Sequence, residues 1–279
     1  MAQGAAVSPA GSAQVERLLA AMEQLPSRAN AALRVLWLAD DPTTSLADLA
    51  AAVEADPALT ARLLALANSA YYSPRSHVSN VSRAITVLGF ATVRTVATTA
   101  ACGLSGRGAT PKGFWEHAAA AANACQLLAW RYGAQSGEAF ALGLLHDLGR
   151  GLLFQADREG SAAVDAAVAK GGDRLALERE RFGLTHADAA ARVLVAWRFP
   201  PGMTAAIALH HDRPELDSEP LERLIVAAEA VVAIANPIDD EPVVGDHELA
   251  SLTLAADRLS SIVERVREEA ESLAGVLAG

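Results

Sequence analysis

The sequence predicts an all-α protein built from two lobes. Its 279 residues are 52% hydrophobic, and much of that share is alanine, the strongest helix former. No segment shows the alternating pattern of a strand, and one Gly/Ser/Pro-rich segment, 103–113, divides the chain. We therefore expect a flexible tail at 1–12, an N-terminal lobe at 13–110 and a C-terminal lobe at 111–279.

The N-terminal lobe is expected to be a series of short helices. Ser45 and Asp48 resemble a capping box, with Asp in place of the usual Glu or Gln. Asp56 and Pro57 form a helix start, with Asp as the N-cap and Pro at the first helical position. Gly89 should break a longer helical pattern. The predicted helices are 14–24, 29–38, 45–54, 56–68, 79–88 and 90–101.

The C-terminal lobe continues the helical pattern from residue 114 onward. Its segment 139–148 is nearly all apolar and should be fully buried. A Pro/Asp-rich loop at 236–246 separates the last two helices. The predicted helices are 114–132, 139–148, 161–170, 173–182, 185–197, 201–211, 221–235 and 255–277.

Composition and charge limit the compartment and the partners. The net charge is −10, and residues 111–279 hold fifteen basic and twenty-six acidic side chains. This acidic half argues against a general nucleic-acid surface. Cys102 and Cys125 have no CxxC spacing, which favours a reducing cytoplasm. No signal peptide and no uncharged apolar run of about 18 residues is present, so we expect no membrane partner.

The most informative feature is an adjacent His146-Asp147 pair at the end of the apolar segment. Neutral imidazole and carboxylate are the usual ligands of borderline divalent metals. Neighbouring side chains on a helix point about 100° apart, so the carboxylate can bridge two ions while the histidine binds one. Gly149 is expected to end this helix and leave the space open. The outlying histidines of the series are His117, His186, His210 and His211.

Structural interpretations compete with this one. A single histidine on a buried helix is more often a hydrogen-bonded core residue, which is how we interpret His77 and His247. The five histidines of the series could also tie helices together by hydrogen bonds. Asn68 can cap the helix before it or contact a ligand, and both roles stay open.

Residues 46–68 have the outline of a helix-turn-helix. Its second helix has one basic residue, Arg62, and an apolar face, so a core helix is favoured over a DNA-reading one. Arg75, Arg83 and Arg94 could add a modest basic patch, although scattered surface arginines are the favoured account.

Several separate motifs carry a family resemblance. They span about residues 15–215 and, in order, are Leu25-Pro26, 55–64 (ADPALTARLL), 67–72 (ANSAYY), 84–89 (AITVLG), 114–117 (FWEH), 143–149 (GLLHDLG), Thr185-His186, 197–200 (WRFP) and His210-His211. This ordered set resembles the HDOD family, the HD-related output domain of bacterial signalling proteins.

The resemblance implies an all-helical fold with a C-terminal HD-type lobe, distantly related to HD and HD-GYP phosphohydrolases. It places His117, His146, Asp147, His186, His210 and His211 where HD-GYP-type enzymes hold metals. Glu229, in Ala228-Glu229, stands where those enzymes have Asp. Arg150 stands where many have Lys, which makes it a candidate ligand-binding residue. The GYP segment is missing after the histidine pair.

The resemblance implies a cytoplasmic bacterial regulator that binds signalling proteins, or a nucleotide, without catalysis and without a required cofactor. The alternative is a metal-dependent phosphohydrolase that uses Mn, Fe, Ni or Zn on a nucleotide or a cyclic dinucleotide. Links to cyclic-di-GMP signalling and a homodimer through the last helix both remain open.

Overall fold

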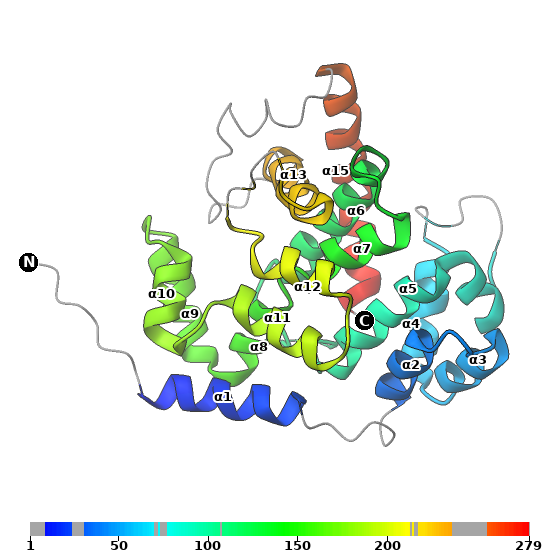
Figure 1. The fold of residues 1–279 in the computed structure, drawn as a ribbon, viewed down its shortest axis with the longest axis horizontal. Helices are drawn as coiled ribbons and strands as arrows, with labels where there is room; N and C mark the ends of the chain where they lie inside the picture. The colour runs from blue at the N-terminus through cyan, green and yellow to red at the C-terminus, as the bar shows by residue number, and fades with distance from the viewer. Residues whose placement is uncertain are drawn as a thin grey trace, which may run out of the picture.

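The computed structural model describes residues 9–23, 31–69, 72, 77–106, 108–212, 214, 217–235 and 256–278. Within these residues all regular structure is α-helical and strands are absent, so the predicted fold class is confirmed. Figure 1 shows α2 to α5 gathered on one side of the molecule and the remaining helices on the other. The expected loop at 236–246 lies outside the described residues.

The N-terminal lobe contains α2 (Ala31–Asp40), α3 (Leu46–Glu54), α4 (Pro57–Ala67) and α5 (Val81–Ala101). Local capping rules explain the starts of α3 and α4. Ser45 and Asp48 form the predicted capping box, and Asp56 accepts hydrogen bonds from the first turn of α4. Gly89 breaks α5 as predicted, because its φ of 78° and ψ of 159° are non-helical.

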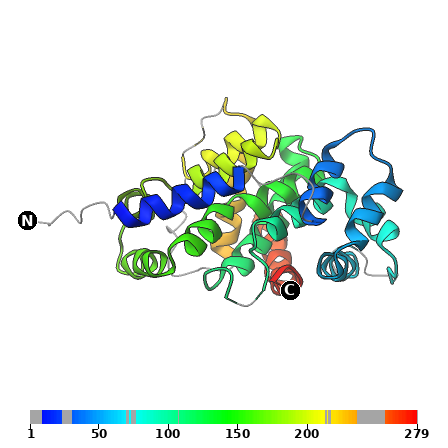
Figure 2. The same cartoon turned by 90° about the horizontal axis from the view of Figure 1, so that it is seen from below.

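The first helix, α1 (Pro9–Glu23), differs from the expected organisation in two ways. It begins inside the expected tail 1–12, of which residues 1–8 lie outside the described part. It also packs on α8, α10 and α11 instead of the N-terminal lobe, as Figure 2 shows. Val15, Leu19 and Met22 are buried there, and Trp197 Nε1 donates a hydrogen bond to the Met22 carbonyl. Apolar spacing predicted this helix but could not identify its partner.

The C-terminal lobe is built around α6 (Phe114–Tyr132), which packs against α7 (Ser136–Leu145), α13 (Pro220–Ala235) and α15 (Ala256–Ala278). The alanines 118–122 of α6 are completely buried. A Cβ at Gly143 would lie 2.4 Å from the carbonyl oxygen of Ala121, so α7 crosses α6 with backbone against backbone. Small residues thus bring these two helices together at the level of the His-Asp pair.

The segment after the His-Asp pair corrects one expectation. The predicted helix 139–148 ends at Leu145, and a new helix, α8 (Leu148–Ala156), follows Asp147. Gly149 lies in the first turn of α8 and does not leave open space, because the carbonyl of His186 fills it. Four further helices complete the lobe: α9 (Arg158–Val168), α10 (Arg174–Phe182), α11 (His186–Ala196) and α12 (Pro201–Ala208).

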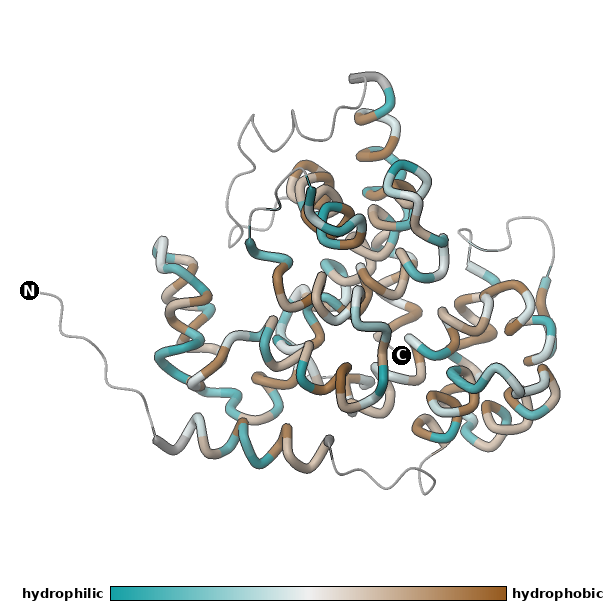
Figure 3. The backbone as a smooth tube through the Cα atoms, in the orientation of Figure 1, coloured by the Kyte–Doolittle hydropathy of each residue, from teal (hydrophilic) through white to brown (hydrophobic). Residues whose placement is uncertain are grey.

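Within the described part of the chain, one helix, α5, is long and apolar enough to cross a membrane by length and composition. However, 61% of its most apolar window is buried inside the protein, as in an ordinary core helix. Its sequence also mixes hydrophobic and hydrophilic residues, as Figure 3 shows for the helices in general. The geometry of α5 is therefore that of a core helix shared by the two lobes, where it contacts α2, α4 and α7.

Candidate metal centre

The predicted histidines and Asp147 converge on one point in the C-terminal lobe. They come from four separate parts of the chain: α6, the junction of α7 and α8, the start of α11, and the turn after α12. Glu229 reaches the same point from α13. We define the candidate metal centre as His117, His146, Asp147, His186, His210, His211 and Glu229.

One group of possible ligands consists of His117, His146 and Asp147. The two histidine Nε2 atoms are 3.0 Å apart, and each lies 3.7 Å from a carboxylate oxygen of Asp147. Glu229 approaches the same Nε2 atoms at 3.5 Å and 3.4 Å. The Glu229 carboxylate therefore lies beside the same two ligand atoms.

A second group consists of Asp147, His186, His210 and His211. Asp147 Oδ1 lies 3.2 Å from His186 Nε2 and 3.6 Å from His210 Nε2. His211 Nε2 lies 2.8 Å from His186 Nε2. In each group the candidate ligand atoms lie within 4.8 Å of one another. Asp147 belongs to both groups, which is the arrangement expected of a carboxylate that bridges two ions.

The imidazole rings are oriented so that Nε2 faces the centre. Nδ1 of His146 lies 2.7 Å from the Gly143 carbonyl oxygen, and Nδ1 of His210 lies 2.6 Å from that of Ile207. A carbonyl can only accept, so both Nδ1 atoms carry the proton and both Nε2 lone pairs are directed inward. This is the usual outer-shell arrangement around metal-binding histidines. The donor set therefore fits a borderline divalent metal.

Glu178 completes the same pattern for His186, although no sequence motif singled it out. Its Oε2 accepts hydrogen bonds from His186 Nδ1 at 2.7 Å and from the His186 backbone N–H at 2.8 Å. The side chain is 2% exposed. The sequence contained one signal of its burial. Glu178 lies one helical turn before the apolar Phe182, so both side chains are on the inward face of α10.

Burial and charge set the protonation states of the metal-free centre. Burial lowers the pKa of His146 to about 3 despite the nearby Asp147. Burial opposes ionisation of Asp147, but His146 and His186 keep its pKa well below the usual range. Burial also disfavours charge on His186, but Glu178 and Asp147 raise its pKa to about 9. At neutral pH His146 is thus a neutral donor, and His186 must lose a proton before it can bind a metal.

The other predicted site residues lie at the edge of the centre or away from it. Arg150 Nη1 donates to Asp147 Oδ2 at 3.2 Å, so it lies beside the shared carboxylate. Asn68 bonds to the backbone of Leu64 and Val78 through both ends of its amide, which ties a loop to α4 and is a structural role. His77 is exposed, so its interpretation as a core residue is wrong, and His247 lies outside the described residues.

Of the four arginines considered with the helix-turn-helix outline, Arg62 and Arg94 are engaged inside the protein. Arg62 is buried and donates to Ser105 Oγ, and the apolar face of α4 packs against α5. Arg94 is buried against Asp40. Arg83 is exposed, and Arg75 lies outside the described residues. The face proposed to read DNA is therefore part of the lobe's interior.

The fold and the centre together define the class of protein. A chain whose described regular structure is all helical, and whose His-Asp pair joins two groups of metal-ligand type, is an HD-like domain. The model of the HDOD domain matches residues 25–213, and the chain belongs to the HDOD family. No curated protein matches the chain.

Solved structures agree with this assignment. A candidate phosphohydrolase from Shewanella amazonensis SB2B is 26% identical, with a TM-score of 0.71 over 96% of this chain and 100% of the other. A candidate signal transduction protein from Marinobacter aquaeolei VT8 is 22% identical, with a TM-score of 0.70 over 97% and 66%. An HDOD domain protein of unknown function from Geobacter sulfurreducens is 20% identical, with a TM-score of 0.66 over 95% and 96%. The last two similarities show the fold alone.

Proposed function

We propose that the chain is a cytoplasmic signal-transduction module of a bacterium that acts by binding other signalling proteins, without turnover. Membership of the HDOD family supports a signalling role. The structural observation that carries the proposal is the burial of the centre. The side chains of His117, His146, Asp147, His186 and His210 are all 6% exposed or less.

A buried centre suits a structural metal better than a catalytic one. Catalytic metals keep a coordination position open to water and substrate, whereas structural sites are closed by protein ligands. Here only Glu229, at 22%, and His211 offer appreciable exposure. We infer that a divalent ion such as Mn, Fe, Ni or Zn would be held by the two groups that share Asp147. Its binding would stabilise the fold that partners recognise.

The alternative function is metal-dependent phosphohydrolysis of a nucleotide or cyclic dinucleotide. One specific observation favours it: Asp147 is shared by two ligand groups, as in enzymes that use two metals. A metal pair supplies an activated water and a clamp for phosphate oxygens when it is bound. Arg150 lies beside Asp147 and would face the same oxygens. The similar Shewanella structure also carries a phosphohydrolase description.

One experiment separates the two functions. The protein is purified without chelator, its metal content is measured, and nucleotides and cyclic dinucleotides are offered with Mn²⁺. Bound metal without turnover supports the module. Hydrolysis that is lost in His146→Ala would establish the enzyme and refute the non-catalytic proposal. A metal content below a tenth of an equivalent, unchanged by soaking in metal, would refute metal binding both for the signalling module and for the phosphohydrolase.

A further inference from the structure

We propose that Glu178 is the positioning residue for His186 and gives the group Asp147, His186, His210 and His211 the tighter hold on metal. This inference rests on the proposed metal binding and adds a residue to it. Glu178 lies outside the candidate centre and touches it through His186.

The first support is the number of constraints that one carboxylate oxygen imposes. His186 is the first residue of α11, where backbone N–H groups have no helical partner. Glu178 Oε2 accepts that N–H and also the proton of His186 Nδ1. The negative charge of Glu178 also lies at the N-terminus of α11, which is the positive end of the helix dipole. The ring of His186 is therefore fixed both in rotation and in tautomer, with Nε2 toward Asp147.

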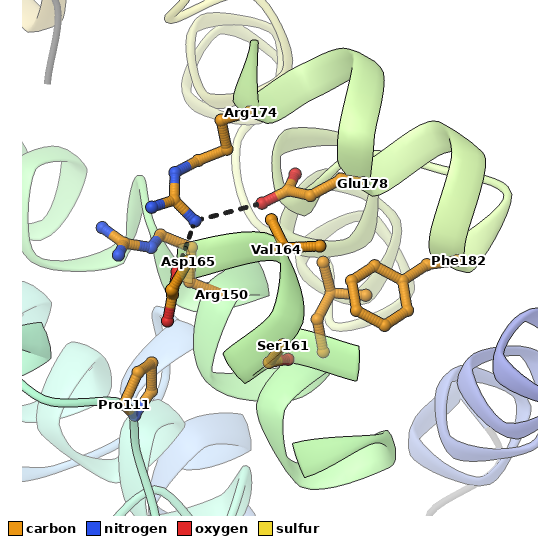
Figure 4. Close-up of a pocket in the computed structure, with 9 residues that line it drawn as sticks. Pro111, Arg150, Ser161, Val164, Asp165, Arg174, Glu178 and Phe182 are labelled. Carbon is orange, nitrogen blue, oxygen red and sulfur yellow. Dashed lines mark hydrogen bonds and ion pairs between the residues drawn. The ribbon is translucent and has the colours of Figure 1, made fainter. Parts of the chain in front are cut away.

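The second support is that Glu178 is itself held in place, as Figure 4 shows. Arg174 Nη1 lies 2.8 Å from Asp165 Oδ1 and 3.9 Å from Glu178 Oε1. This chain of charges links α9 to α10 and then to α11. The hollow lined by these side chains has a volume of about 10 Å³, which suits nothing larger than a water molecule. The network therefore serves the protein's own geometry and is no ligand pocket.

The third support is the difference between His186 and the other oriented histidines. His146 and His210 are held by neutral carbonyls, and His186 is held by a carboxylate. A carboxylate partner increases the basicity of the imidazole and hence its strength as a ligand once the ring has given up its second proton. The group that contains His186 should therefore bind metal more tightly than His117, His146 and Asp147 alone.

The test uses Glu178→Gln, which keeps one acceptor and the side-chain size but removes the charge. Glu159→Gln is the matched control, because Glu159 is an exposed carboxylate on α9. Zn²⁺ is titrated into chelator-treated full-length protein by calorimetry, and Co²⁺ absorption spectra report the ligand set. Ring ¹⁵N spectra of the zinc-loaded protein report the tautomer of His186.

We expect Glu178→Gln to weaken the tighter zinc-binding step about 10- to 100-fold, to leave the weaker step unchanged and to disturb the His186 tautomer. Glu159→Gln should match wild type. Equal weakening of both zinc-binding steps would show a merely structural role for Glu178 and overturn the inference. A tighter step that is unchanged in Glu178→Gln would also overturn it. Wild-type protein that binds no zinc would overturn the proposed metal binding as well, so the two failures are distinguishable.

Discussion

Gly149 and His186 meet backbone to backbone at the centre of the C-terminal lobe. A Cβ built on Gly149 would lie 1.8 Å from the carbonyl oxygen of His186. Gly149 comes two residues after Asp147, and His186 opens α11. The contact between α8 and α11 therefore sets how far the shared Asp147 carboxylate lies from His186, the histidine at the start of α11.

Gly149→Ala is expected to destabilise the protein severely. The obstacle is a backbone carbonyl and not the end of a flexible side chain, so α8 and α11 must separate. We expect a loss of about 3 kcal/mol or more in the free energy of unfolding, measured by urea titration. Gly275→Ala is the control, because nothing lies within 4 Å of a Cβ there. It should stabilise α15 by about 0.5–1 kcal/mol. Equal stability of the two variants would contradict the packing argument.

Asp147→Asn should remove metal binding by both groups at once. The carboxylate is the one ligand that the two groups share, and the amide is a neutral and poorer ligand. In wild type, metal at 100 times its Kd should add about 2.7 kcal/mol of stability. The variant should show almost none of this gain in thermal unfolding with and without Zn²⁺. Glu54→Gln, on the exposed surface of α3, should keep it. A gain retained by Asp147→Asn would place the metal elsewhere.

Local rules predicted much of the fold. The caps at Ser45 and Asp56 and the break at Gly89 depend on a few neighbouring residues, and the structure confirms them. Gly149 shows where such rules fail. In sequence it resembles a helix end, but it is glycine because α11 approaches it closely. That contact joins residues far apart in the chain, so no local pattern contains it.

In the candidate centre, too, the sequence predicted residue types but not the contacts between distant helices. His146, Asp147 and the outlying histidines could be named from residue type and order, and the structure brings them together. Glu178 could not be named in this way, because its role depends on the approach of α10 to the start of α11. The position of α1 on the C-terminal lobe was equally hidden, since an amphipathic helix does not specify which surface it covers.

The histidines of the candidate metal centre should make their largest contribution to the stability of the metal-free protein near pH 6.5. The pKa of buried His146 falls to about 3, so between pH 3 and 6.5 the unfolded state binds more protons and acid destabilises the fold. The pKa of His186 rises to about 9, so its stabilising contribution is complete below pH 6.5 and is lost as pH rises to 9. Burial also lowers the pKa of His211 to about 2, so His211 adds to the acid limb. Each histidine can contribute a slope of up to about 1.4 kcal/mol per pH unit.

Urea titrations in EDTA from pH 4 to 9.5 measure both limbs. His146→Gln should flatten the acid limb relative to wild type. Glu178→Gln should flatten the alkaline limb, because it removes a charge that raises the pKa of His186. Wild-type stability that rises steadily from pH 6.5 to 9 would show that His186 is not charged in the metal-free protein.

Arg94 should be a main link between the two lobes. It pairs with Asp40 Oδ1 at 2.5 Å, and its Nη2 donates to the carbonyls of Trp197 and Arg198 at 3.0 Å and 3.1 Å. Its guanidinium also lies 4.0 Å from the ring centre of Phe199. One planar, forked cation thus satisfies the turn that leads into α12 and then to His210.

Arg94→Met keeps the length of the side chain but leaves these carbonyls without their donor. We expect a loss of about 2–4 kcal/mol in the free energy of unfolding, because buried acceptors that lose their partner cost about 1–3 kcal/mol each. Arg83→Met, at an exposed position of the same helix, should change stability by less than about 0.5 kcal/mol. Both are measured by urea titration followed by near-ultraviolet circular dichroism. If Arg94→Met matched Arg83→Met, Arg94 would not be a main link between the lobes, and the turn before α12 would not need it.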